Sequence, residues 1–274
     1  MRLVANISII FSRIPFLDRF EAASRAGFDL VECWWPHAEF AEGLQEDAIV
    51  DAVARAGVSV VMLNFDGGNL PAGDRGLAGD PGRAAEFRAN VPRALALAGR
   101  LGCTKLNALA GKSVPSVPLA DQLALLSESV AFAAGEAAVF GATVLVEPLN
   151  LPETPGYLLP DVAAALDLIG TVPHSNVQLQ FDVYHVARAG ADPVAAIRQA
   201  AGHIGHVQIA DLPGRHEPGT GDLPFKQILD ALREVGYDGD IGLEYVPTNP
   251  EAPDFSYASG LRELVVDSHA RRGN

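Results

Sequence analysis

Apolar residues along this chain gather in eight short runs, and each run leads into a stretch where apolar positions recur at helical spacing. Continuous apolar runs of this kind are typical of parallel strands buried on both faces. The runs predicted as strands are 3–9, 28–34, 58–65, 104–109, 143–146, 177–181, 204–210 and 241–245.

The segments between these runs are predicted as helices, several of them closed by a glycine or opened by a proline. Their ranges are 16–26, 44–56, 83–101, 119–140, 160–169, 193–201, 225–235 and 257–269. Eight strand and helix units of about 34 residues each suit the βα repeat. The pattern therefore predicts a single (β/α)₈ TIM barrel over residues 1–274, without a second domain.

One stretch, 66–82, is rich in Gly, Pro and Asp and has no periodicity. A loop of this length in a compact domain is usually functional, often as a lid. We expect it to cover the mouth of the barrel and to move when substrate binds.

Charge and cysteine content narrow the class of protein. The net charge of −14 and pI near 4.8 argue against a nucleic-acid or anionic-membrane partner, and no apolar run is long enough to span a bilayer. Only Cys33 and Cys103 occur, and neither a disulfide framework nor an export signal is expected, so the prediction is a cytoplasmic protein. A small-molecule substrate fits this composition, and a homo-oligomer is compatible with it.

Four side chains with oxygen atoms lie at or near the ends of successive predicted strands: Glu147, Asp182, Gln208 and Glu244. A single acidic residue there more often caps the next helix. Four matching positions favour a site instead, because TIM barrels carry their catalytic groups at the C-terminal ends of the strands. Gln208 is chosen over Asp211 because period-two alternation turns Gln208 inward, and Asp211 is expected to brace a loop.

Two glutamates, one aspartate and one amide oxygen fit Mg²⁺ or Mn²⁺ better than zinc. Such an ion can bind two adjacent substrate oxygens and stabilise an enediolate. Glu147 and Glu244 belong to strands on opposite sides of the mouth. Each can then act as acid or base on one substrate carbon.

Three further residues are candidates for substrate binding. His185 follows Asp182 and can donate to a substrate oxygen, or it is a solvated loop histidine. Arg215 is either a surface charge or, beside a metal site, the clamp for a substrate carboxylate. Lys112 is a weaker candidate for the same role.

Four residues keep two interpretations. Trp34 and Trp35 either wall the pocket, which we favour, or pack against the lid. Glu32 and Asn107 interrupt apolar runs and are either site residues or satisfied polar groups of the core.

These residues lie in segments that resemble the hydroxypyruvate isomerase family, within the xylose-isomerase-like barrel superfamily. The resemblance runs through nearly the whole chain: ANISIIF, GFDLVE, GDRGLAGDPGR, KLNALAGK, VEPLN, QFDVYH, GHVQIADLPGRHEPGTG and GLEY. It implies that Glu147 and Glu244 are the acid/base pair and metal ligands, with Asp182 and Gln208 completing the coordination. Similarity to ketose 3-epimerases implies substrate contacts by His185 and Arg215.

The resemblance implies an isomerase that interconverts hydroxypyruvate and 2-hydroxy-3-oxopropanoate (tartronate semialdehyde). The alternatives are a 2-oxo-tetronate isomerase or a ketose 3-epimerase acting on a longer sugar or sugar acid. Those epimerases carry a histidine on strand seven where this chain has Gln208, which favours the isomerases. The acidic charge argues against a DNA-repair endonuclease, and the presence of both glutamates argues against a non-catalytic sugar-binding barrel.

Overall fold

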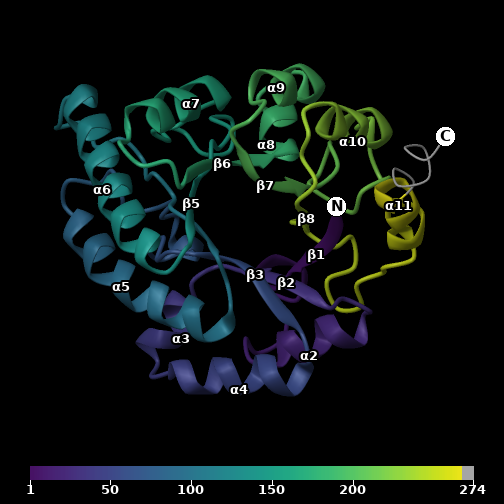
Figure 1. Cartoon of the computed structure of the whole chain (residues 1–274). Helices are drawn as coiled ribbons and strands as arrows, with labels where there is room; N and C mark the ends of the chain where they lie inside the picture. Colours follow the sequence, from purple (N-terminus) through teal and green to yellow (C-terminus); the bar gives the residue numbers. More distant parts are fainter. Residues whose placement is uncertain (267–274) are drawn as a thin grey trace.

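Eight parallel strands close into a barrel in chain order, which confirms the predicted (β/α)₈ architecture. The computed structural model describes residues 1–266, and Figure 1 shows the strands ringed by helices. The strands are β1 Arg2–Asn6, β2 Leu30–Cys33, β3 Ser59–Asn64, β4 Lys105–Asn107, β5 Thr143–Val146, β6 Val177–Asp182, β7 Ile204–Ile209 and β8 Asp240–Leu243.

The longer helices form the outer layer around the strands, and those such as α4 and α10 bury apolar residues along one side. None of those within residues 1–266 is long and apolar enough to cross a membrane. They are α1 Ile7–Ile10, α2 Asp18–Arg25, α3 His37–Ala41, α4 Glu46–Ala56, η1 Leu70–Ala72, α5 Ala84–Leu101, α6 Leu119–Val139, α7 Val162–Thr171, α8 Val183–Arg188, α9 Pro193–Gln199, α10 Phe225–Glu234 and α11 Tyr257–Val266.

Four short helices, α1, α3, η1 and α8, were not predicted, and α1 and α8 both begin where a polar residue ends a strand. The first run was expected to remain extended through Ile9, but β1 ends at Asn6, whose side chain accepts from the backbone N–H of Ser8 and caps α1. Asp182 ends β6 and caps α8 in the same way through the N–H of Tyr184. Such side chains compete with strand pairing and favour a helix start.

Other boundaries agree to within a few residues. The last helix was predicted over 257–269, and the part of it beyond Val266 lies outside the described residues. Asp161 accepts from the N–H of Ala164 and caps α7, so this helix begins at Val162, two residues after the predicted start. Cys33 and Cys103 are both free and buried.

The interior of the barrel is polar at the level where the strands end. Register pairs Gln180 of β6 with His206 of β7, and Asp182 with Gln208. All four side chains are buried, and Gln208 faces inward as the alternation predicted. The barrel therefore carries a layer of hydrogen-bonding groups directly beneath its mouth.

Candidate active site

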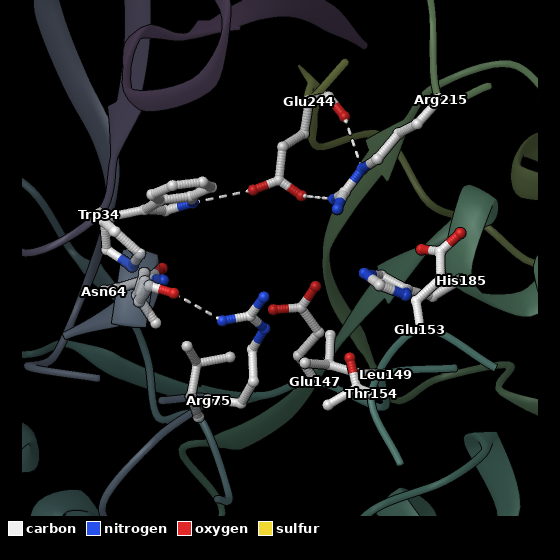
Figure 2. Close-up of a pocket in the computed structure, with 13 residues that line it drawn as sticks. Trp34, Asn64, Arg75, Glu147, Leu149, Glu153, Thr154, His185, Arg215 and Glu244 are labelled. Atoms are coloured by element: carbon white, nitrogen blue, oxygen red, sulfur yellow. Dashed lines mark hydrogen bonds and ion pairs between the residues drawn. The ribbon is translucent and has the colours of Figure 1, made fainter. Parts of the chain in front are cut away.

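A cavity of about 280 Å³ opens at the C-terminal ends of the strands (Figure 2). Its walls include Glu147 after β5, Glu244 after β8, and His185 of α8. The loop 66–82 contributes Leu70 and Arg75, so this loop lies over the mouth as expected. The cavity thus occupies the catalytic end of a TIM barrel.

Glu147 is buried and is held on one carboxylate oxygen. Its Oε2 accepts from Asn107 Nδ2 at 2.7 Å and from Gln180 Nε2 at 2.9 Å. Oε1 has no hydrogen-bond donor among residues 1–266. Burial raises the pKa of Glu147 well above its usual range, and repulsion from Glu244 and Asp182 adds to the shift.

Glu244 is held on both carboxylate oxygens. Oε1 accepts from Trp34 Nε1 at 2.9 Å and from Asn6 Nδ2 at 3.1 Å, while Oε2 accepts from Arg215 at 2.5 Å. Burial raises the pKa of Glu244, although Arg215 opposes the shift. Figure 2 shows this carboxylate between Trp34 and Arg215, facing the cavity.

His185 lies in a helix and is buried, so the interpretation as a solvated loop residue is wrong. Its Nδ1 faces two N–H donors of Asn150, the backbone at 3.2 Å and the side chain at 2.7 Å. Nδ1 is therefore the acceptor, and Nε2 carries the hydrogen. Burial, together with the charges of Arg215 and Arg75, holds the pKa of His185 well below its usual range, so the ring is neutral.

Asp182 completes a group of potential metal ligands. One ligand atom each from Glu147, Asp182 and His185 lie within 4.8 Å of one another, and His185 Nε2 is 3.6 Å from Asp182 Oδ2. Burial raises the pKa of Asp182 to about 7, with Arg215 opposing and Glu244 adding to the shift. Buried carboxylates that resist ionisation together fit a divalent cation, which supplies the missing positive charge.

Gln208 is linked to this group through Gln180 and does not line the cavity. Gln180 Nε2 donates both to Gln208 Oε1 at 2.7 Å and to Glu147 Oε2. The amide nitrogen of Gln208 donates to Glu32 at 2.6 Å. Because a carboxylate only accepts, Glu32 turns the Gln208 oxygen toward the metal-ligand group. Its predicted role as a ligand stays a prediction.

Glu32 anchors the polar layer below the cavity. Besides Gln208, it accepts from Asn6 at 3.0 Å and approaches His206 Nε2 at 2.6 Å. Gly242 leaves the room for this carboxylate, since a Cβ there would lie 2.5 Å from a Glu32 oxygen. Glu32 is a satisfied interior group that reaches Glu244 through Asn6, whereas Asn107 contacts Glu147 directly.

Arg215 lies against the site's own carboxylates. Besides Glu244, its Nη2 donates to Asp182 Oδ2 at 3.3 Å, and the guanidinium stacks 5.1 Å from the ring centre of Tyr184. Its φ of 57° is rare for a residue with a side chain and is held by the surrounding loop. Asp211 braces that loop by accepting four backbone N–H groups, as expected.

Lys112 does not line the cavity. Its Nζ donates to the carbonyl of Gly73 at 2.8 Å and so fastens the loop 66–82 to the loop after β4. A cavity residue that the sequence interpretation missed is Arg75, in the same loop. Its placement between two glycines in a loop at the mouth, GDRG, is the signal that could have identified it.

Trp34 and Trp35 have different surroundings. Trp34 walls the cavity, as favoured, and donates to Glu244. Trp35 is buried and packs against Phe40 of α3 and the guanidinium of Arg93. Only Trp34 therefore has a place at the site.

The sequence is similar to a barrel family and to several isomerases. The family described as Xylose isomerase-like TIM barrel matches residues 20–264. Escherichia coli hydroxypyruvate isomerase is 36% identical and covers 92% of this chain and 96% of its own length. A Cupriavidus necator 2-oxo-tetronate isomerase is 38% identical over 90% of this chain and 93% of its own.

A Streptomyces coelicolor protein with the provisional name hydroxypyruvate isomerase is 44% identical over 93% of this chain and 95% of its own length. Among solved structures, one titled AP endonuclease, family 2, from Brucella melitensis is 36% identical, with a TM-score of 0.85 over 94% of this chain and 98% of that one. The chain therefore belongs to the xylose isomerase-like TIM barrel family, as an aldose–ketose isomerase of the hydroxypyruvate isomerase type.

Proposed function

We propose that this enzyme interconverts hydroxypyruvate and 2-hydroxy-3-oxopropanoate by moving a proton between adjacent carbons. The observation that carries the proposal is the pair of buried carboxylates, Glu147 and Glu244, at one cavity. Two such groups can act as base and acid on neighbouring atoms of one substrate. The names of the similar proteins from Escherichia coli and Streptomyces coelicolor support this substrate.

For the metal we propose Mg²⁺ or Mn²⁺, held by Glu147, Asp182, Gln208 and Glu244. The donors are mostly carboxylate and amide oxygens, which these hard cations prefer. When bound, such an ion would polarise the substrate carbonyl and stabilise negative charge on its oxygen. His185 stays free for the substrate in this assignment, because its Nε2 carries the hydrogen that a substrate oxygen can accept.

From hydroxypyruvate, a C–H bond breaks at C3 and a C–H bond forms at C2, with an enediolate between the two steps. One glutamate takes the proton from C3 and the other delivers a proton to C2. The oxygen on C3 loses its hydroxyl hydrogen and becomes the aldehyde oxygen, and the oxygen on C2 gains a hydrogen and becomes the hydroxyl. On Glu147 we assign this work to Oε1, since Asn107 and Gln180 occupy Oε2. Arg215 keeps Glu244 oriented toward the cavity.

The enediolate must be kept from water, and the loop 66–82 is placed to do this. Leu70 and Pro71 present apolar surface to the cavity from above. Closing an active site with such residues prevents loss of a reactive intermediate to side reactions.

A second candidate is the isomerisation of a four-carbon 2-oxo acid. It is favoured by the Cupriavidus necator 2-oxo-tetronate isomerase, whose identity of 38% is close to that of the hydroxypyruvate isomerases. The cavity of about 280 Å³ also has room for one carbon more than hydroxypyruvate.

A substrate panel with product analysis decides between these activities. We expect the highest kcat/KM with hydroxypyruvate, and 2-hydroxy-3-oxopropanoate as the product. Higher kcat/KM with a 2-oxo-tetronate would establish the second candidate. Epimerisation of a neutral ketose without turnover of hydroxypyruvate would reject both.

We further propose that the enzyme works in the cytoplasm and as a homo-oligomer. The free, buried thiols of Cys33 and Cys103 suit a reducing compartment. Sedimentation of the purified chain would test the oligomeric state.

A further inference from the structure

Arg75 is a positive charge in the cavity that no side chain of residues 1–266 neutralises. Its Nη1 donates to two backbone carbonyls, Leu70 at 2.9 Å and Asp74 at 2.6 Å. The carboxylate of Asp74 is itself paired with Arg83 at 2.6 Å. Figure 2 shows the guanidinium of Arg75 among the side chains that line the cavity.

Arg215 differs from Arg75 in this respect. Its guanidinium is engaged by Glu244 and Asp182, at 2.5 and 3.3 Å. Using Arg215 to bind a substrate carboxylate would draw it from a carboxylate that the proposed mechanism requires. Arg75 can bind an anion without breaking any ion pair.

The balance of charges at the site also indicates that Arg75 binds an anion. Three buried carboxylates at the cavity, Glu147, Asp182 and Glu244, would be balanced in charge by the proposed divalent cation together with Arg215. A fourth, Glu32, lies in the layer below against His206 Nε2 at 2.6 Å. Glu153 at the rim is paired with Arg188 at 2.9 Å. Arg75 is then the charge left over, and a substrate with one carboxylate would neutralise it.

We propose that Arg75 binds the carboxylate of the substrate and makes the enzyme selective for 2-oxo acids over neutral ketoses. This inference rests on the proposed function and specifies how its substrate class is recognised. The guanidinium can donate two parallel hydrogen bonds to a carboxylate, which a single ammonium group cannot do. Lys112 assists by holding Gly73, two residues before Arg75, through its 2.8 Å hydrogen bond.

The test compares two inert ligands of the same skeleton, glycerate and glycerol, which differ only in a carboxylate against a CH₂OH group. Their dissociation constants are measured by calorimetry on the full chain with Mn²⁺ present. We expect the wild type to prefer glycerate, and Arg75→Gln to weaken glycerate by about 10- to 100-fold while leaving glycerol unchanged. Arg75→Lys should retain part of the preference.

Arg83→Gln is the matched control, because Arg83 bonds to Asp74 of the same loop but lies outside the cavity. It should leave glycerate binding unchanged, and an equal loss in Arg83→Gln would show that Arg75→Gln acts only by disturbing the loop. Unchanged glycerate binding in Arg75→Gln, or a preference lost in Arg215→Lys alone, would overturn the inference.

The same variants separate this inference from the proposed function. Binding of glycerate through Arg75 without any turnover of hydroxypyruvate would contradict the function and leave the inference standing. Turnover of hydroxypyruvate with a KM that Arg75→Gln does not change would contradict the inference alone.

Discussion

Glu147 and Glu244 are chemically identical, yet their surroundings give them different freedom. Glu147 is held by two amide donors on one oxygen, whereas Glu244 is held on both oxygens by Asn6, Trp34 and Arg215. Hydrogen bonds from a charged donor favour the ionised carboxylate, and burial disfavours it. The balance differs at the two glutamates, as an acid and base pair requires.

Replacing either glutamate by glutamine should lower kcat by about 10³-fold or more, since the amide cannot accept the proton. Bound Mn²⁺ must be measured in the same samples, because both residues are also proposed ligands. Glu153→Gln is the control, a carboxylate of the same cavity that bonds to Tyr184 and Arg188. A comparable loss of kcat in this control would show that kcat responds to charge anywhere in the cavity.

Glu32 should contribute mainly to stability. In Glu32→Gln, one oxygen becomes an NH₂ group that cannot accept from Asn6, His206 or Gln208, so a buried donor loses its partner. We expect the free energy of unfolding to fall by about 1–3 kcal/mol, measured by urea denaturation. Glu21→Gln, an exposed ion-pair partner of Arg25, should change it by less than about 0.5 kcal/mol. Equal effects in the two variants would contradict this account of Glu32.

Metal affinity should depend on pH through Asp182. The pKa of this carboxyl is raised to about 7 by burial, and its proton must leave before the oxygen can ligate a cation. Mn²⁺ binding to the unloaded enzyme should therefore strengthen as pH rises toward about 7, by roughly tenfold per pH unit for each proton displaced. Calorimetric titrations across this range measure it, and an affinity that stays constant from about pH 5.5 to 8 would contradict the assignment.

Among the elements, the loop 66–82 is held by side-chain bonds at Gly73 and Asp74 in its first half and by burial and backbone pairing in its second half. Gly76 pairs with Ala110, and Leu77 and Ala78 are buried, so the second half is fixed to the barrel. The first half carries η1 and places Leu70 and Pro71 over the cavity. A lid movement would therefore involve the first half.

Hydrogen exchange tests this division. Saturating hydroxypyruvate should slow amide exchange in residues 66–74, because closure shields that part of the loop from water. Helix α6, on the outside of the barrel, serves as the reference and should be unaffected. Equal exchange of the loop with and without substrate would remove the lid from the mechanism.

The limits of sequence interpretation are also visible in the elements. Strands such as β5 and β7 were predicted to within a residue, because apolar runs between glycines and prolines report burial directly. Helices α1 and α8 were missed, since a four- or six-residue helix after a strand leaves too short a pattern. That omission is why a solvated loop histidine was one of the two interpretations of His185.

Site residues at strand ends could be predicted, since a carboxylate at the end of a buried strand stands out against its neighbours. Glu147, Asp182 and Glu244 were found in this way. Arg75 was missed, because the GDRG segment marks a loop at the mouth, but the side chain reaches the cavity through tertiary contacts such as the Lys112 to Gly73 bond. The direction in which the side-chain amide of Gln208 points could not be predicted either, because it is set by a hydrogen bond to Glu32, which is far away in sequence.

For the whole molecule, the barrel and the polar layer inside it have different structural roles. The outer helices and the strand core hold the barrel closed, and the layer from Glu32 to Asn107 fixes the side chains that line the mouth. The net charge of −14 makes local positive charge at the cavity necessary for binding an acid. The metal, Arg215 and Arg75 would supply it there.

Isomerisation of hydroxypyruvate in D₂O, followed by NMR at early times, tests the central claim that carboxylates transfer a proton. One glutamate takes the proton from C3 and the other delivers to C2 a proton that can exchange with solvent, so deuterium should appear at C2 of the product, at least in part. A sample without enzyme corrects for spontaneous exchange. Product that contains no deuterium and retains the substrate's own hydrogen in full would indicate a hydride shift, and would leave the two glutamates without the role proposed for them.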